Sequence, residues 1–211
     1  DCDDQGNVHP SRWLAAEGRG MRLADFASHA NARTANLDVT HVAALRFYTT
    51  AAFRTINNGL RDQARYRAKR PHPLPVTVAL IREALGRLRA VAGESSEANT
   101  MVTLYRGMKD MKVENNFLQE GKGGTELAPM STTSSLKVAM QYSASEASLP
   151  LRLRTKHFMV RGPDTSFLSA FPGEQELLSP PPTYPEPVAD ATQTLRVDHG
   201  PFTATDGAPK H

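Results

Sequence analysis

The chain has 211 residues, of which 39% are hydrophobic and 22% are charged, as in a soluble globular protein with polar ends. A formal net charge of +3 without a nucleic-acid-binding motif gives no reason to expect a nucleic-acid partner. No stretch approaches 18 consecutive apolar residues, so no transmembrane helix is predicted. The single cysteine, Cys2, excludes an internal disulfide framework.

The same features bear on localisation. The N-terminus shows no signal-peptide pattern, and one cysteine suits a reducing compartment, so we expect a soluble protein and favour the cytoplasm. The first residue is Asp1 rather than methionine. We therefore expect a processed, trimmed or fragmentary chain, which leaves targeting open.

The first half of the chain has a helical pattern. Residues 1–36 are polar and weakly periodic, which predicts a weakly structured lead with a short helix anchored near Phe26. From 39 to 65, apolar residues recur at steps of three and four, which predicts one amphipathic helix. Its apolar stripe consists of Val42, Leu45, Tyr48, Ala52, Phe53, Ile56 and Leu60. Prolines between 71 and 75 break the chain, and a second amphipathic helix follows through Val91.

After residue 100 the pattern changes to short strands separated by turns. The predicted strands are 101–105, 127–132, 149–153, 158–161 and 176–178. A further helix is expected over 136–145, with Ser134 or Ser135 as its N-cap. Helices followed by strands predict an α+β fold, with one domain over 37–187 and a flexible tail over 188–211.

Two glutamates close together, Glu174 and Glu176, follow a Pro-Gly turn. In an extended strand, residues two apart point to the same face, so we expect their carboxylates side by side, where they repel each other. Enzymes that cleave glycosidic bonds use such pairs, because one carboxylate can stabilise an oxocarbenium-like centre while the other handles a proton. The alternative is that the two glutamates lie at a solvent-exposed strand end and have no catalytic role.

Two earlier motifs could complete such a site. In Leu104–Met108, Arg106 is followed by Gly107; a guanidinium can bind phosphate, and glycine permits close backbone approach to a ligand. In Met130–Ser135, hydroxyl side chains can orient a carboxylate or cap the following helix. Either motif alone also fits an ordinary structural role.

In this order, LYRGM, APMSTTS and FPGEQELLSPP resemble the motifs of the mono-ADP-ribosyltransferase family with the Arg–Ser–Glu signature. The Glu-X-Glu spacing resembles its arginine-modifying branch. Residues 44–61 are similar to that family's upstream helix, and the resemblance covers roughly 38–187. It implies a split β-sandwich with a helical N-terminal portion, NAD as cosubstrate, and a target protein carrying the acceptor arginine. We expect a monomer.

The resemblance also implies roles for the acidic and hydroxyl residues. Glu176 would be the catalytic glutamate, contacting the nicotinamide-side ribose and stabilising the oxocarbenium centre. Glu174 would engage the acceptor guanidinium, and Ser131 would hold Glu176 in place. Phe171 would contact the target protein, whereas Phe167 is expected to pack inward.

The resemblance also implies contacts to the dinucleotide, from the Arg106 motif, the Ser131 motif and the upstream helix. Arg106 would bind the diphosphate or its nearby ribose, with Gly107, Ser131 and Thr132 beside it. Asn57 and Arg61 on the upstream helix are further candidates, each with a structural alternative. Tyr48 is expected to be a core or rim aromatic.

Some features depart from the family pattern or leave alternatives open. Thr133 replaces the last serine of the Ser-Thr-Ser motif, and 191–197 is a poor candidate for the family's final strand. An NAD glycohydrolase and a catalytically inactive binding module therefore remain alternatives to an arginine-specific transferase. The seven histidines show no metal-ligand spacing, so no metal is expected.

Overall fold

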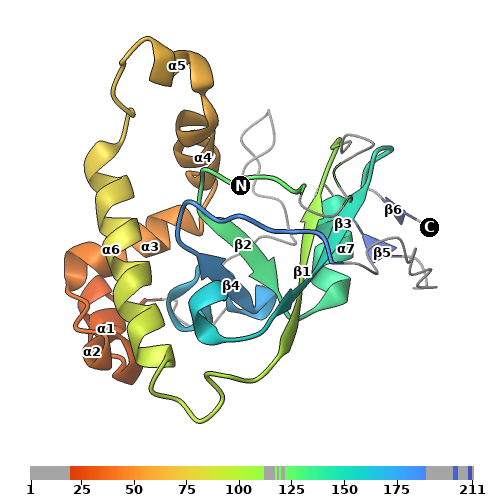
Figure 1. Cartoon of the computed structure of the whole chain (residues 1–211). Coiled ribbons are helices and arrows are strands. Elements are labelled where there is room, and N and C mark those ends of the chain that lie inside the picture. The colour runs from red at the N-terminus through yellow and green to blue at the C-terminus, as the bar shows by residue number, and fades with distance from the viewer. Residues whose placement is uncertain are drawn as a thin grey trace.

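The computed structural model describes residues 20–111, 117, 119, 122–188, 202–203 and 209–210. A helical layer from the first half of the chain packs beside a four-stranded antiparallel sheet from the second half (Figure 1). This order of elements confirms the predicted α+β class.

The helical layer begins inside the predicted weakly structured lead. Two short helices, α1 (Leu23–Ala27) and α2 (Ala30–Thr34), precede α3 (Val39–Tyr48) and the long α6 (Pro75–Ala92). α3 packs on α6, and Phe26 of α1 is buried in the same core. The last part of the expected lead is therefore helical and contributes to the core.

The single helix predicted from Val39 to Arg65 is wrong, because the chain breaks after α3 and resumes as α4 (Phe53–Arg61). Thr49 and Thr50 lie at the break. Each donates its hydroxyl to the carbonyl three residues earlier, at 2.8 and 2.7 Å. Hydroxyl side chains that satisfy terminal carbonyls in this way favour the end of a helix.

A second break follows at Asp62, which separates α4 from the short helix α5 (Gln63–Arg67). The Asp62 carboxylate accepts a hydrogen bond from the backbone N–H of Arg65 at 2.9 Å and so caps α5. Figure 1 shows α5 projecting away from the sheet. The second predicted helix is confirmed as α6.

The sheet has the strand order β3-β1-β2-β4, and all of its neighbours are antiparallel. Its strands are β1 (Val102–Met108), β2 (Met130–Thr133), β3 (Leu149–Thr155) and β4 (Glu176–Ser179). Four predicted strands are thus confirmed. The fifth, at 158–161, is wrong: Phe158–Val160 form a 3-10 turn, and the Phe158 ring packs where Gly93 leaves room for it.

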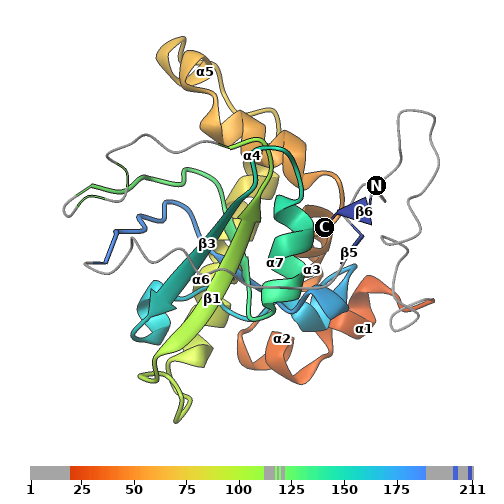
Figure 2. The ribbon, with the colours of Figure 1, turned by 90° about the vertical axis from the view of Figure 1, so that its right-hand side faces the viewer.

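The predicted helix at 136–145 is confirmed as α7 (Leu136–Ser143), and Ser135 is its N-cap. α7 packs on β1, as Figure 2 shows. Gly107 permits this contact, because a Cβ atom there would collide with the backbone carbonyl of Ala139. The glycine therefore has a packing role on the α7 side of β1.

The C-terminal region contributes two short strands, β5 (Phe202–Thr203) and β6 (Pro209–Lys210), which pair antiparallel. The candidate final strand at 191–197 lies outside the described residues. Within the described part of the chain, no helix has both the length and the apolar character needed to cross a membrane.

Candidate active site

The register of β2 and β4 brings Ser131 and Glu176 together. Thr133 lies directly opposite Glu176, and Ser131 is two residues away from Thr133 on the same face of β2. The Ser131 hydroxyl lies near enough to the Glu176 carboxylate to lower its pKa. Thr165 donates a hydrogen bond to Glu176 Oε2 at 3.4 Å. The sheet thus fixes this carboxylate between two hydroxyl groups.

The electrostatic surroundings of Glu176 oppose its ionisation overall. Burial is the main cause that raises the pKa of Glu176 above its ordinary value, and the nearby charge of Glu174 raises it further. Hydrogen bonds from Ser131 and Thr165, together with the charge of Arg106, act in the opposite direction. A positive charge formed beside Glu176 would therefore stabilise its ionised form.

Glu174 lies close to Glu176, but not in the way the sequence predicts. Pro172–Glu174 form a 3-10 turn, and Gln175 has a left-handed backbone with φ of 49°, so the expected common strand face is wrong. Repulsion between the two carboxylates still contributes to the raised pKa of Glu176. The turn brings the two charges together from different elements.

Two hydroxyl groups outside the predicted site hold Glu174. The phenol of Tyr142, on α7, donates to Glu174 Oε1, and the Thr133 hydroxyl donates to the Glu174 backbone carbonyl at 2.9 Å. Thr133, the residue that departs from the Ser-Thr-Ser pattern, thereby anchors the turn. Tyr142 was missed because only tertiary packing brings α7 to this turn.

Arg106 lies inside β1 rather than at its end, because β1 pairs with β3 along seven residues up to Met108. Its Nη1 donates to the backbone carbonyl of Ser131 at 2.9 Å, which ties the guanidinium to the strand that holds Glu176. Gly107 faces α7, on the opposite side of β1 from Arg106. The cofactor contact expected for Gly107 stays a prediction.

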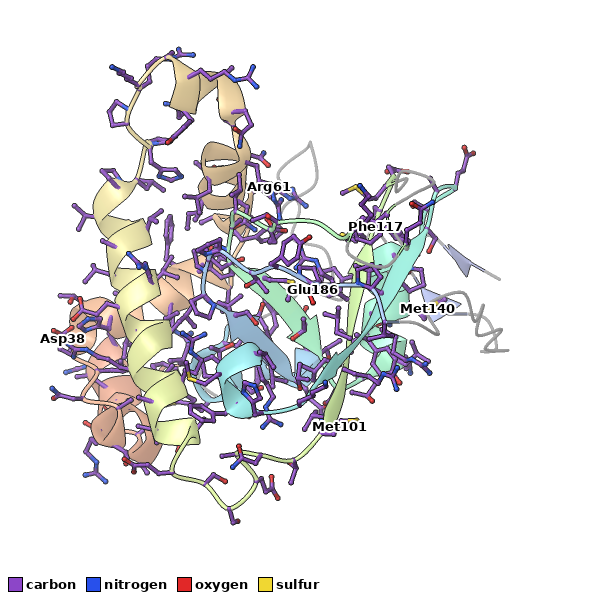
Figure 3. The ribbon with its side chains drawn as sticks, viewed as in Figure 1. Asp38, Arg61, Met101, Phe117, Met140 and Glu186 are labelled. Atoms are coloured by element: carbon purple, nitrogen blue, oxygen red, sulfur yellow. The ribbon has the colours of Figure 1, made fainter. Side chains whose placement is uncertain are left out.

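Glu126 is a charged residue of the site that the sequence did not indicate. Arg61 donates to it through Nε and Nη2 at 2.9 and 2.7 Å, and Arg106 donates through Nη2 at 2.9 Å. In Figure 3, Arg61 lies where α4 approaches the segment that leads into β2. The two predicted arginines are therefore joined by one carboxylate, which lies outside every predicted element.

Asn57 and Tyr48 form a buried pair near this cluster. The Tyr48 hydroxyl donates to the carbonyl of Pro129 at 3.1 Å and accepts a hydrogen bond from Asn57 Nδ2 at 3.2 Å. Burial, with the charge of Glu176, raises the pKa of Tyr48. Asn57 Oδ1 is buried and has no hydrogen-bond partner within the described part of the chain. Tyr48 is a core aromatic, as expected.

Thr132 and Phe171 are both buried. The Thr132 hydroxyl donates to the backbone carbonyl of Leu177 at 2.9 Å, on the face of β2 opposite Ser131. Phe171 is 9% exposed, so its expected contact with a target protein stays a prediction. Phe167 packs inward, as expected, and stacks on His29 with ring centroids 4.6 Å apart.

The loop before Glu174 is fastened to the helical layer. Arg46 of α3 donates to the backbone carbonyl of Leu168 at 2.8 Å, and its guanidinium lies 3.9 Å from the centroid of the Phe26 ring. The backbone N–H of Ala170 donates to the Thr49 hydroxyl at 3.0 Å. Helices α1 and α3 thus support the segment that carries the site's first carboxylate.

No protein-family model matches the chain, and a comparison with curated proteins finds no match either. Solved structures do match. The chain is similar to the ADP-ribosyltransferase HopU1 of Pseudomonas syringae pv. tomato, with 20% identity and a TM-score of 0.60, covering 99% of this chain and 88% of HopU1. It is also similar to Vis toxin, an ADP-ribosyltransferase of Vibrio splendidus, with 17% identity and a TM-score of 0.51, covering 93% of this chain and 95% of the toxin.

A third similar structure is the eukaryotic mono-ADP-ribosyltransferase ART2.2, with 18% identity and a TM-score of 0.52, covering 80% of this chain and 66% of that protein. At these identities the likeness establishes the fold, and the chain has the fold of ADP-ribosyltransferases. The predicted fold class is confirmed. Among the described residues, no group of three His, Cys, Asp or Glu side chains is placed to hold a metal ion.

Proposed function

We propose that the protein transfers ADP-ribose from NAD to arginine side chains of a target protein and releases nicotinamide. The observation that carries the proposal is the convergence of Arg106, Ser131 and Glu176 on β1, β2 and β4. Arg106 donates to the Ser131 carbonyl at 2.9 Å, and Ser131 and Arg106 both act to lower the pKa of Glu176. The shared fold supports the same class of reaction. A structure of ART2.2 in complex with NADH supports a nicotinamide dinucleotide as the ligand.

The arginines and carboxylates suit different parts of NAD. Arg106 and Arg61 offer guanidinium N–H groups to the diphosphate. Glu176 supplies negative charge for the nicotinamide-side ribose, and Ser131 keeps that carboxylate in one orientation. Asn57, with its buried and unpaired Oδ1, suits an N–H or O–H donor of the ligand.

The reaction needs charge stabilisation more than strong acid catalysis. As the C1′–N bond breaks, its electron pair leaves with nicotinamide and positive charge develops on the ribose. Glu176 stabilises this charge from a fixed position beside the ribose. A guanidine nitrogen of the acceptor then bonds to C1′ and loses one proton, which the nearby carboxylate of Glu174 can accept.

The preference for arginine follows from the second carboxylate. Glu174 is held by Tyr142 and Thr133 close to Glu176, so an acceptor guanidinium bound by Glu174 lies beside the reacting ribose. A planar guanidinium and a carboxylate form strong, directional ion pairs. This placement favours attack by arginine over attack by water.

The test is incubation of the purified protein with NAD, with and without the guanidino compound agmatine. We expect nicotinamide release that agmatine accelerates, and mass spectrometry that detects an ADP-ribose adduct on agmatine and on arginines of proteins in a lysate. Release without any adduct would establish an NAD glycohydrolase instead. If the protein neither releases nicotinamide nor binds NAD, the proposal is contradicted, and a catalytically inactive binding module is the remaining alternative.

A further inference from the structure

The carboxylate of Glu126 occupies the arginine pair to which the proposed function assigns the diphosphate of NAD. Arg61 contacts Glu126 through Nε and Nη2, the two-pronged edge that a guanidinium also offers to a phosphate. Arg106 contacts the same carboxylate through Nη2. The strongest anion-binding edge of Arg61 is therefore already filled by the chain itself.

Glu126 is held firmly in this position. Its backbone exchanges two hydrogen bonds with Thr183, at 2.8 and 3.0 Å, and its Oε1 accepts the backbone N–H of Ala128 at 3.0 Å. The side chain is 16% exposed. Burial acts to raise the pKa of Glu126, but hydrogen bonds from Arg61 and Ala128 and the charges of both arginines outweigh it and lower the pKa overall. The carboxylate is therefore charged at neutral pH.

We infer that Glu126 is a specificity-determining residue, whose fixed negative charge on the Arg61–Arg106 pair disfavours highly charged phosphates and leaves a dinucleotide with a doubly esterified diphosphate as the preferred ligand. The inference rests on the proposed function for the identity of that dinucleotide. Coulomb repulsion grows with the charge of the ligand. Inorganic pyrophosphate and nucleoside triphosphates carry more negative charge than the diphosphate of NAD, in which each phosphorus bears one ionised oxygen. Glu126 therefore weakens the binding of pyrophosphate and nucleoside triphosphates more than it weakens the binding of NAD.

Calorimetric titration of the full chain with inorganic pyrophosphate and with NAD tests this inference. In Glu126→Gln we expect pyrophosphate to bind about tenfold more tightly than in the wild type, because one repelling charge is gone and one of the two oxygens that Arg61 contacts becomes an amide NH2, which cannot accept a hydrogen bond. The affinity for NAD should rise by a smaller factor. Glu126→Asp keeps the charge, so its preference between the two ligands should stay close to that of the wild type.

Glu83→Gln is the matched control. It removes a glutamate of α6 that pairs with Arg87 at 2.6 Å and lies 3.6 Å from His41, which contacts Asp38. Asp38 itself lies far from Arg61 in Figure 3. Glu83→Gln should leave both affinities unchanged. The inference is overturned if Glu126→Gln binds pyrophosphate no more tightly than the wild type, or gains the same factor for both ligands.

A measurement on the wild type covers the case in which the variants fail to fold. The carboxylate carbon resonance of Glu126 should move when pyrophosphate saturates the protein, because the phosphate charge then lies beside the carboxylate on the same arginine pair. An unmoved resonance at saturation would overturn the inference. The proposed function is judged separately, because nicotinamide release from NAD depends on Glu176, whereas pyrophosphate binding requires no glycosidic bond.

Discussion

At the scale of single residues, the fold works against the ionisation of its own catalytic candidate. Burial raises the pKa of Glu176, so the ionised carboxylate is less stable in the folded chain than in the unfolded chain. A carboxyl whose folded pKa is raised weakens the fold once the pH exceeds its unfolded pKa, and this loss of stability is complete above the folded pKa. Because the Ser131 and Thr165 hydroxyls can also hydrogen-bond an amide oxygen, a neutral isostere fits the same place.

Glu176→Gln should therefore reduce activity and increase stability together. We expect nicotinamide release to fall by roughly two to three orders of magnitude, as on removal of an electrostatic stabiliser. The melting temperature at neutral pH should rise by a few degrees, since a neutral amide replaces a carboxyl whose ionisation the fold opposes. Calorimetry and a nicotinamide assay measure the two effects. Lost activity with a lower melting temperature would contradict the electrostatic account.

The pH dependence of the reaction gives a separate test through Ser131. Its hydrogen bond lowers the pKa of Glu176, so Ser131→Ala should raise that pKa further. Because the proposed mechanism uses the ionised form of Glu176, the acid limb of the rate profile for nicotinamide release should move to higher pH. Ser134→Ala is the control, since Ser134 is exposed and donates to Gln175 rather than to Glu176. An unmoved acid limb in Ser131→Ala would remove Ser131 from this role.

Glu174 and Tyr142 test the division between transfer and hydrolysis. Glu174→Gln should suppress agmatine modification and spare hydrolysis of NAD. Tyr142→Phe removes the phenol that donates to Glu174, so we expect a smaller effect of the same kind, with a roughly tenfold loss of kcat/KM for agmatine. Tyr66→Phe, at an 80% exposed position on α5, should change neither rate. Equal loss of both reactions in Glu174→Gln would show that the two carboxylates have no separate roles.

At the scale of elements, the close packing of α7 on β1 depends on Gly107. Gly107→Ala places a Cβ atom against the backbone of Ala139 and Ser143, which cannot move without shifting the whole helix. We expect a loss of about 2–4 kcal/mol in the free energy of unfolding. Gly86→Ala is the control: the site is in α6 with open space around it, and it should gain about 0.5–1 kcal/mol. Urea denaturation measures both, and a neutral Gly107→Ala would contradict the packing account.

Elements with a regular local pattern were predictable from the sequence, and those set by single side chains were not. The strands around Arg106 and Ser131 follow from short apolar runs between turns, and the helix after Ser135 follows from its cap and periodicity. The apolar stripe from Val42 to Leu60 continues across Thr49, so periodicity alone gave no sign that two hydroxyls end α3.

The candidate site shows the same limit. Arg106, Ser131 and Glu176 could be proposed as site residues because their motifs occur in the same order along the chain as in the family that the sequence resembles. The register of the β-sheet then brings these residues together. Glu126 has no such motif, and only the fold brings it between α4 and β1. Tyr142 contacts Glu174 only because α7 packs against β1. Contacts between distant segments of the chain leave no local pattern by which to find them.

At the scale of the whole molecule, the N-terminal helices and the site form one connected structure. Phe26 of α1 is 6% exposed and lies under the guanidinium of Arg46, which holds the backbone of Leu168. Phe167, the neighbour of Leu168, stacks on His29 just before α2. A disturbance in α1 therefore reaches the loop that leads to Glu174, although α1 lies far from it in the sequence.

Phe26→Ala tests this connection. We expect it to cost about 3–5 kcal/mol, because it leaves a cavity in the core and removes the ring beneath Arg46. Amide hydrogen exchange at Ala170, whose N–H is bonded to Thr49, should become faster, and KM for agmatine should rise more than KM for NAD. Leu23→Ala is the control on the same helix, since Leu23 is 40% exposed and should change stability by no more than about 0.5 kcal/mol. If Phe26→Ala destabilises the protein while exchange at Ala170 and KM for agmatine stay unchanged, the helical layer supports the core alone and does not position the acceptor side of the site.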